Sequence, residues 1–205
     1  MHRVIHVVER IILASGSQAR QTLLQNAGVI FEVRVARIDE DAIRASMQNE
    51  GAKLRDIADA LAQAKARKIS LKEPDALVIG CDQVLDFDGV LVKKPQDLAD
   101  AARQLQDLAG RQHRLLSAVV ICLNGEPQWR HVGSVRMRMR KLSPEYLADY
   151  LERNWHYIRH SVGCYKLEEE GVRLFSGIEG DYFCVLGLPL IELLGYLIQR
   201  RAVPG

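Results

Sequence analysis

The chain lacks an excess of either charge, closely spaced cysteines and a long apolar run. Its 205 residues include 28 Lys and Arg and 26 Asp and Glu, a net charge of +2. This balance argues against general nucleic-acid or membrane binding, so any anion site must be local. The four cysteines lack the paired spacing of a zinc site, and we expect reduced thiols. Glu9 and Glu192 interrupt the most apolar segments, so we expect a soluble, cytoplasmic protein.

The pattern of apolar residues predicts strands that alternate with helices. The predicted strands cover residues 11–14, 31–35, 76–85, 113–123 and 129–139. The predicted helices cover 18–26, a region from 39 to 69, and segments that begin near 97, 143 and 189. Asn124-Gly125 is a hairpin signal between two of the strands. We therefore predict an α/β fold with a mixed twisted sheet flanked by helices, as one domain over 1–205 or as two lobes around a cleft.

One carboxylate, Asp82, lies inside the apolar strand predicted at 76–85. Burial of an ionised carboxylate costs several kcal/mol unless a cation, a metal or hydrogen bonds compensate it. Lys93 and Lys94 follow shortly after a turn at 86–89, so a hairpin would bring acid and cations together, as in a phosphate and metal site. The alternative is an aspartate that only caps a turn at the end of the strand.

A Ser-Gly-Ser loop precedes the helix predicted at 18–26. Such a loop presents backbone N–H groups and the positive end of the helix dipole. Ser15 and Ser17 add hydroxyl groups, and Arg20 lies in the first turns of the helix. The unit is a candidate triphosphate cradle, although serine also caps many helices that bind no phosphate.

Further charged side chains allow two interpretations each. Lys65 lies on an alanine-rich helix, where it is either a solvated residue or one that reaches into a cleft. Asp39, Glu40 and Asp41 are either favourable charges at a helix N-terminus or metal ligands. We expect His113, at the start of a strand, to be structural rather than catalytic.

Arg136, Arg138 and Arg140 alternate with apolar residues on one predicted strand. Their side chains should form one basic face. This face is either solvated or part of a wall that binds an anion. An RNA-associated module that uses it is a possible alternative function, but the overall charge balance argues against it.

In their order along the chain, these segments resemble the signatures of the Maf family, whose members are nucleoside triphosphate pyrophosphatases similar to septum formation inhibitors. The resemblance covers nearly the whole chain. The matching segments are Ala-Ser-Gly-Ser at 14–17, Ile-Asp-Glu at 38–40, Leu-Ala-x-x-Lys-Ala at 61–66, Gly-Cys-Asp-Gln-Val at 80–84, Lys-Pro at 94–95, Gly-x-x-His at 110–113, and the C-terminal segments at 163–168, 178–180 and 187–190.

The resemblance implies hydrolysis of a nucleoside triphosphate to its monophosphate and pyrophosphate. It also implies a divalent metal, an elongated fold with a central cleft, and a homodimer. By position, Asp82 matches the catalytic acid, and Lys65 and Lys94 match motif lysines. Arg20 matches one of the basic residues of the loop and helix, and Glu40 matches the carboxylate at the end of a strand. Glu40 and Asp82 are the expected ligands of Mg²⁺ or Mn²⁺, because both offer hard oxygen donors. A non-catalytic nucleotide-binding regulator of cell division is the alternative function.

Two departures from the family pattern bear on substrate binding. Gln18 and Ala19 replace the usual Pro and Arg of the loop, so one phosphate-binding cation is missing. Glu168 replaces the Gln of the branch that acts on thymidine and uridine triphosphates, and Gln83 follows the catalytic acid. Both features resemble the 7-methyl-GTP branch, and a glutamate can accept hydrogen bonds from a purine N–H edge. If residues 168–170 form only a solvated turn, this inference about the base fails.

Overall fold

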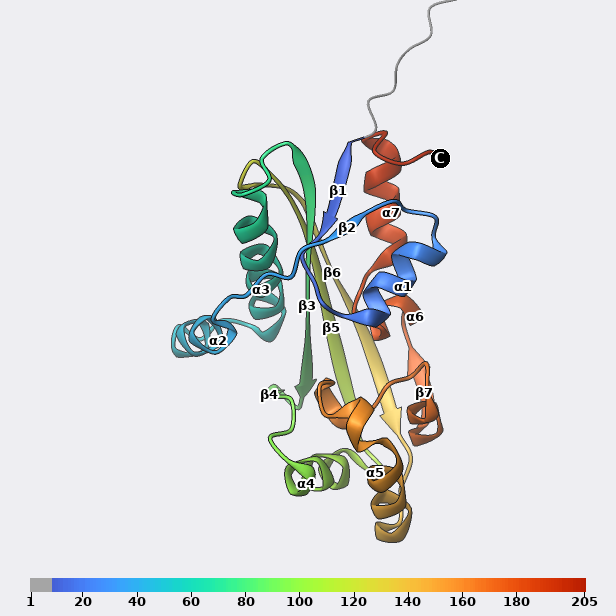
Figure 1. The fold of residues 1–205 in the computed structure, drawn as a ribbon. Helices are drawn as coiled ribbons and strands as arrows, with labels where there is room; N and C mark the ends of the chain where they lie inside the picture. The colour runs from blue at the N-terminus through green and yellow to red at the C-terminus, as the bar shows by residue number, and fades with distance from the viewer. Residues whose placement is uncertain (1–8) are drawn as a thin grey trace, which may run out of the picture.

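The computed structural model describes residues 9–205 and contains a mixed seven-stranded sheet along the long axis of the molecule (Figure 1). The strand order is β2-β1-β3-β5-β6-β7, and β4 pairs with β3. The strands are β1 (Arg10–Leu13), β2 (Glu32–Val33), β3 (Ala76–Phe87), β4 (Val90–Val92), β5 (Gln112–Leu123), β6 (Glu126–Met139) and β7 (Phe175–Glu179). Strand β1 runs parallel to β2 and β3, and the other pairs are antiparallel. The apolar run before Glu9 lies outside the described residues.

Residues 9–205 contain seven α-helices. They are α1 (Gln18–Asn26), α2 (Glu40–Asn49), α3 (Leu54–Ser70), α4 (Leu98–Leu108), α5 (Pro144–Ile158), α6 (Tyr182–Val185) and α7 (Leu190–Gln199). Helix α3 covers one face of the sheet, with α2 beside it rather than on the sheet, and α1, α6 and α7 cover the other face (Figure 1). Helices α4 and α5 cover the far end. No helix in this part of the chain is long and apolar enough to cross a membrane.

The predicted α/β class with a mixed sheet is confirmed, and α1 has the predicted bounds. The structure adds local detail to these predictions. The helical region predicted at 39–69 contains two helices, because Gly51 has a φ of 72° and ends the first one. Strand β2 has two residues instead of five, since its partner β1 ends at Leu13. Strand β7 was not predicted, because its Ser and Gly give no alternating pattern.

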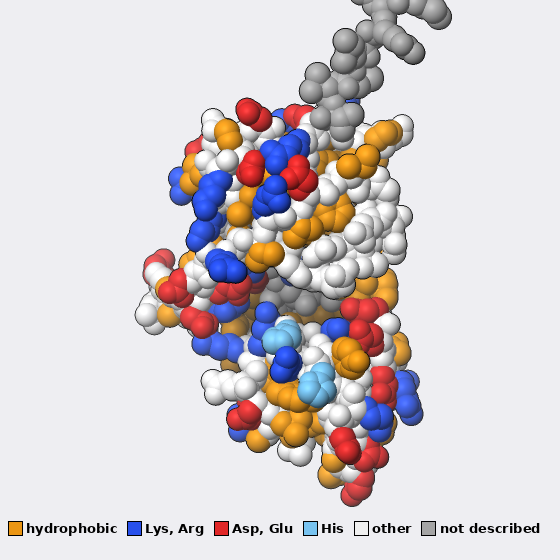
Figure 2. All heavy atoms as spheres, in the orientation of Figure 1, with side chains coloured by type: hydrophobic (Ala, Val, Ile, Leu, Met, Phe, Trp, Pro, Cys, Tyr) orange, Lys and Arg blue, Asp and Glu red, His pale blue; other side chains and the backbone are white. Residues whose placement is uncertain are grey.

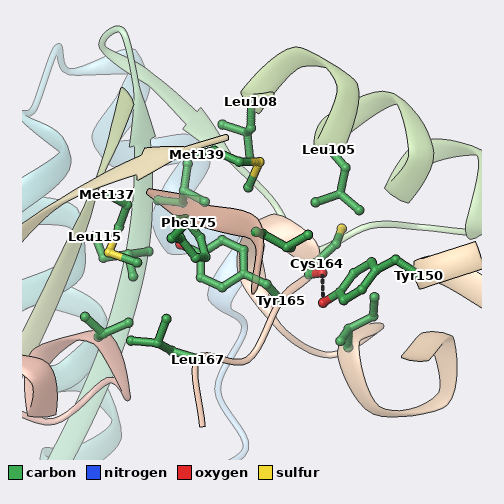
Figure 3. Close-up of a cluster of buried hydrophobic side chains, with 14 of the residues drawn as sticks. Leu105, Leu108, Leu115, Met137, Met139, Tyr150, Cys164, Tyr165, Leu167 and Phe175 are labelled. Atoms are coloured by element: carbon green, nitrogen blue, oxygen red, sulfur yellow. Dashed lines mark hydrogen bonds between the residues drawn. The ribbon is translucent and has the colours of Figure 1, made fainter. Parts of the chain in front are cut away.

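The buried apolar side chains form three clusters along the sheet. One lies between the sheet and α3, and a second between the opposite face and α1 with α7. The third fills the far end, where Val135, Met137 and Met139 point inward as their alternation predicts. Figure 3 shows part of this third cluster, in which the hydroxyl of Tyr150 donates a hydrogen bond to the carbonyl of Cys164 (3.2 Å). The division into two lobes stays a prediction.

His113 belongs to the third cluster. Its Nε2 lies 2.7 Å from the hydroxyl of Tyr165, and its ring also packs against Phe175. Burial lowers the pKa of His113 to about 4, so the ring is neutral at pH 7. These contacts support a structural role for His113.

Gly80 of β3 allows α3 to pass close to the sheet. A Cβ at this position would overlap the carbonyl oxygen of Ala62 and lie 2.6 Å from the amide nitrogen of Ala66. Both atoms belong to the backbone of α3 and cannot turn aside. The glycine therefore sets the separation between α3 and β3.

We expect Gly80→Ala to lower the free energy of unfolding by about 1–3 kcal/mol, because the added methyl group must push the two backbones apart. Gly195→Ala is the matched control. A Cβ there meets no atom within 4 Å, and alanine favours a helix over glycine by up to about 1 kcal/mol. Denaturant unfolding measures both variants. Equal stability of Gly80→Ala and the unsubstituted protein would contradict the close approach.

Candidate active site

Strand β3 has an open edge in its middle. On one side β5 accompanies it from Val78 to Asp86. On the other side β1 pairs with it only up to Ile79, and β4 begins to pair at Leu85. Between these points lies a cleft of about 1360 Å³, larger than a typical small-ligand pocket. Figure 2 shows the molecule hollowed across its middle, with Lys, Arg and His side chains on the lower rim.

The cleft collects every predicted site residue. They come from the loop before α1, from α2 and α3, from β3, and from the segments after β4 and after α5. They are Ser15, Ser17, Arg20, Glu40, Lys65, Asp82, Lys94 and Glu168. The cleft itself confirms the predicted cleft of the fold.

Asp82, Lys65 and Glu40 form a chain of ion pairs at the centre of the cleft. The Nζ of Lys65 lies 2.5 Å from Oδ1 of Asp82 and 2.8 Å from Oε1 of Glu40. The side chains of Lys65 and Asp82 are 12% and 6% exposed. The interpretation of Lys65 as a solvated surface residue is therefore wrong. Gly80 allows α3 to approach β3 closely, and this approach brings Lys65 of α3 into contact with Asp82 of β3.

The turn-capping alternative for Asp82 is also wrong. The carboxylate that caps this turn belongs to Asp86, whose Oδ1 accepts a hydrogen bond from the amide of Gly89 (2.8 Å). Asp86 also forms an ion pair with Arg114 at 2.5 Å. Asp82 lies four residues earlier on β3, where its carboxylate contacts Lys65 of α3 and lines the cleft.

The three acids at 39–41 divide between the two interpretations. Asp39 caps α2, because its Oδ1 accepts a hydrogen bond from the amide of Ala42 (2.9 Å). Asp41 is exposed. Glu40 faces the cleft, where burial alone would raise its pKa; the hydrogen bond and charge of Lys65, together with Arg44, outweigh burial and lower that pKa. Glu40 is therefore ionised at neutral pH.

The loop before α1 is held together by its own side chains. The Oγ of Ser17 caps α1 by accepting a hydrogen bond from the amide of Arg20 (3.5 Å), and the Oγ of Ser15 accepts one from the amide of Ser17 (3.3 Å). Arg20 donates through Nε to the carbonyl of Gly187 (2.8 Å). It donates through NH1 to Ser15 Oγ (3.2 Å) and to the carbonyl of Cys81 (3.1 Å). Arg20 thus joins the loop to β3 and to the C-terminal segment.

Lys94 and Glu168 lie on the rim rather than at the centre. Both side chains are exposed and line the cleft. The neighbouring acids have partners elsewhere: Glu169 pairs with Lys166 at 3.1 Å, and Glu170 pairs with Arg153 at 2.8 Å. Residues 167–169 form a turn in which Glu168 and Glu169 are exposed, as the alternative interpretation expects. Glu168 nevertheless lines the cleft, and its role in base recognition stays a prediction.

The basic face of β6 lies outside the cleft. Arg136 and Arg138 both form ion pairs with Glu179 of β7, at 2.7 and 3.2 Å. All three side chains are about half exposed. These contacts support the interpretation as a solvated strand face.

Two cleft residues had no predicted role. Gln83 donates from Nε2 to Ser117 Oγ (2.9 Å) and to the carbonyls of Cys184 and Val185 (both 3.0 Å), which fixes α6 beside the cleft. Arg44 pairs with Glu40 at 2.5 Å. The partners of Gln83 lie up to 102 residues away in the chain, so no local pattern could reveal this contact. Arg44 follows Glu40 by one helical turn, and that spacing was the available signal.

The acids of the cleft suit a divalent cation. Within residues 9–205, no three His, Cys, Asp or Glu side chains are grouped as a complete metal site. Glu40 and Asp82 nevertheless lie on either side of Lys65 Nζ. The Oδ2 of Asp82 is buried and has no hydrogen-bond partner among the described residues. An unpartnered buried carboxylate oxygen is costly, and it is a hard donor of the kind that Mg²⁺ and Mn²⁺ prefer.

Comparison with known proteins places the chain in a family. Residues 10–200 match the family model described as Maf-like protein. The chain is 60% identical to a nucleoside triphosphate pyrophosphatase of Roseobacter denitrificans, over 95% of this chain and 98% of the relative. It is 59% identical to a protein of the same name from Ruegeria sp. TM1040, over 91% and 94% of the two chains. A 7-methyl-GTP pyrophosphatase of Rhizobium johnstonii is 47% identical over 96% and 98%. The chain therefore belongs to the Maf-like protein family.

Proposed function

We propose that the chain hydrolyses nucleoside triphosphates to the monophosphate and pyrophosphate, with Asp82 as the group that activates water. The observation that carries this proposal is the buried chain of Asp82, Lys65 and Glu40 beside the serine loop in one cleft. Relatives about 60% identical over nearly their whole length bear the name of this activity.

The two oxygens of Asp82 have different surroundings. Lys65 binds Oδ1, whereas Oδ2 has no partner in the described part of the chain. We assign Asp82 as the group that orients the attacking water and accepts its proton. Because Lys65 fixes Oδ1, the carboxylate needs no reorganisation when the water binds.

The serine loop is suited to hold the phosphates. It presents the N-terminus of α1 and its dipole toward the cleft. Arg20 keeps its NH2 group without an acceptor among residues 9–205, and Lys94 lies on the rim. These cations stabilise the negative charge that develops on the leaving pyrophosphate.

A divalent metal fits the charge of the cleft. Six Lys and Arg side chains and five Asp and Glu side chains line it. The six cations are Arg20, Arg44, Lys65, Lys93, Lys94 and Lys166, and the five acids are Glu40, Asp41, Asp82, Glu168 and Glu169. This near balance leaves most of a triphosphate's charge uncompensated. We propose that Glu40 and Asp82 hold Mg²⁺ or Mn²⁺, which when bound neutralises phosphate charge and polarises the phosphoryl group.

For the base we propose a purine, with 7-methylguanine as the first candidate. Glu168 lines the cleft and is exposed there, so its carboxylate can accept hydrogen bonds from a purine N–H edge. Two relatives named 7-methyl-GTP pyrophosphatase are 47% and 45% identical to the chain.

From the family resemblance we also propose that the chain is a homodimer that acts in the cytoplasm. We further propose that it is one domain with two lobes around the cleft.

The first prediction tests Asp82. We expect Asp82→Asn to lower kcat for pyrophosphate release by about 10²–10⁴-fold, because an amide cannot accept the proton from water. Asp75→Asn makes the same change at an exposed position just before β3 and outside the cleft, and it should leave kcat unchanged. Full turnover by a folded Asp82→Asn protein would refute the assigned role. A wild-type protein that binds triphosphates without releasing pyrophosphate would instead favour the regulator.

The second prediction concerns the metal. Treatment with EDTA should abolish pyrophosphate release, and Mg²⁺ or Mn²⁺ should restore it. In Glu40→Gln we expect a weaker equilibrium affinity for Mn²⁺, by tenfold or more, since the variant loses one of two carboxylate ligands. The matched variant is Asp41→Asn, whose side chain is 78% exposed. Calorimetric titration with Mn²⁺ measures the affinity without turnover, and equal affinity in Glu40→Gln would remove Glu40 from the ligand set.

The third prediction concerns the base. Glu168→Gln should lower kcat/KM for 7-methyl-GTP by about tenfold, the cost of replacing a charged acceptor by a neutral one. We expect a smaller effect on dTTP and UTP, so the preference should shift toward pyrimidines. Glu152→Gln, an exposed residue of α5 outside the cleft, serves as the control. If the unsubstituted protein prefers dTTP and UTP clearly, the assignment to Glu168 fails.

A further inference from the structure

Two arginines, Arg20 and Arg44, line the cleft, and the proposed function uses only Arg20. Arginine differs from lysine because its planar group offers five N–H donors that match phosphate oxygens in pairs. The side chain of Arg44 lines the same cleft and is 18% exposed. Its position next to the ion-pair chain raises the question of which ligand it faces.

The donors of Arg20 are largely occupied by the chain itself. Its Nε and NH1 bind the carbonyls of Gly187 and Cys81 and the hydroxyl of Ser15. Only NH2 has no acceptor within residues 9–205. Gly187 packs against the same guanidinium, so closely that a Cβ there would lie 3.1 Å from NH2. Arg20 can therefore offer one edge to a phosphate, but not a second.

The donors of Arg44 are less committed. NH2 pairs with Oε2 of Glu40 at 2.5 Å, and NH1 contacts Oδ1 of Asp41 at 3.4 Å. The Asp41 side chain is 78% exposed, and such a solvated pair contributes little. Three of the five N–H groups of Arg44, including Nε, have no acceptor among the described residues. Arg44 can thus bind an anion while it keeps its contact with Glu40.

The two arginines approach Asp82 from opposite sides. Arg44 belongs to α2, next to α3, whereas Arg20 belongs to α1 on the other side of the sheet (Figure 1). The serine loop and Arg20 lie on the α1 side of the cleft. A phosphate chain that starts at this loop and extends past Asp82 reaches α2, so Arg44 faces the phosphates farthest from the loop.

We propose that Arg44 binds the pyrophosphate part of the substrate and stabilises it as it leaves. In the reaction, the water oxygen bonds to the α-phosphorus and its proton passes to Asp82. The bond from that phosphorus to the bridging oxygen breaks, and its electron pair goes to the pyrophosphate, where Arg44 compensates the added charge. This inference rests on the proposed function of the cleft and adds a second arginine to the groups that bind the phosphates.

The test compares equilibrium binding of two products, inorganic pyrophosphate and a nucleoside monophosphate, by calorimetry in the presence of Mg²⁺. In Arg44→Met we expect pyrophosphate to bind about tenfold more weakly or worse, because charge-assisted hydrogen bonds are lost. Binding of the monophosphate should stay within about twofold, since a lost contact to another group does not alter it. Arg44→Lys should lie between Arg44→Met and the unsubstituted protein, because it keeps the charge but not the paired donors.

Arg55→Met removes one positive charge from the neighbouring helix at an exposed position outside the cleft. It should leave both affinities unchanged and so controls for general electrostatics.

Two outcomes would overturn the proposal. If Arg44→Met weakens the affinity for both products equally, Arg44 only positions Glu40. If a folded Arg44→Met protein binds pyrophosphate as tightly as the unsubstituted protein, Arg44 does not bind it. If Arg44→Met does not fold, Arg44→Lys decides by the same comparison. Arg44-dependent pyrophosphate binding by a protein without hydrolytic activity would support the binding role of Arg44 but reject the proposed function and, with it, the role of Arg44 in the departure of pyrophosphate.

Discussion

The contact between Lys65 and Asp82 is the interaction on which the site depends. Both side chains are almost fully buried, and removing two charges from water costs more than an ordinary ion pair returns unless its geometry is close and further partners are present. The 2.5 Å contact and the second carboxylate, Glu40, supply these partners. Gly80 makes the contact possible, because only a residue without Cβ lets the backbone of α3 come this near to β3. The core packing of one helix therefore determines the geometry of the cleft.

The open edge of β3 explains why the reactive residues come from such distant parts of the chain. Where β1 leaves the sheet, the carbonyl of Cys81 lacks a strand partner and accepts from Arg20 instead. Two residues further along β3, the side chain of Gln83 donates hydrogen bonds to the carbonyls of Cys184 and Val185 at the end of α6. Arg20 thus satisfies a carbonyl of β3 that has no neighbouring strand, and Gln83 satisfies two carbonyls at the end of α6, as buried backbone groups require. The same bonds join the N-terminal loop, the central strand and the C-terminal segment into one wall.

The sequence was sufficient to predict those parts of the fold whose structure depends on neighbouring residues in the chain. The apolar strand around Asp82, the hairpin of β5 and β6, and the serine cap of α1 all follow from neighbouring residues, and their predictions are confirmed. Strands β2 and β7 depend on the partner strand rather than on their own composition. Strand β2 is shorter than predicted, and β7 was not predicted. In the site, family order identified Asp82, Lys65 and Glu40. It gave no role to Gln83 or Arg44, because their contacts exist only after distant segments have packed.

Asp82 and Asp86 show what separates a reactive acid from a structural one on the same strand. Both are 4% exposed, and both have a cation within 2.5 Å. Asp86 uses one oxygen for Arg114 and the other for the amide of Gly89, so both its acceptors are satisfied. Asp82 has its second oxygen buried without a partner in the described part of the chain. A fold selected only for stability gains nothing from such an oxygen, since its desolvation is uncompensated. The unfilled acceptor is compensated only when water or a metal ion reaches it in the cleft, which is the condition that catalysis requires.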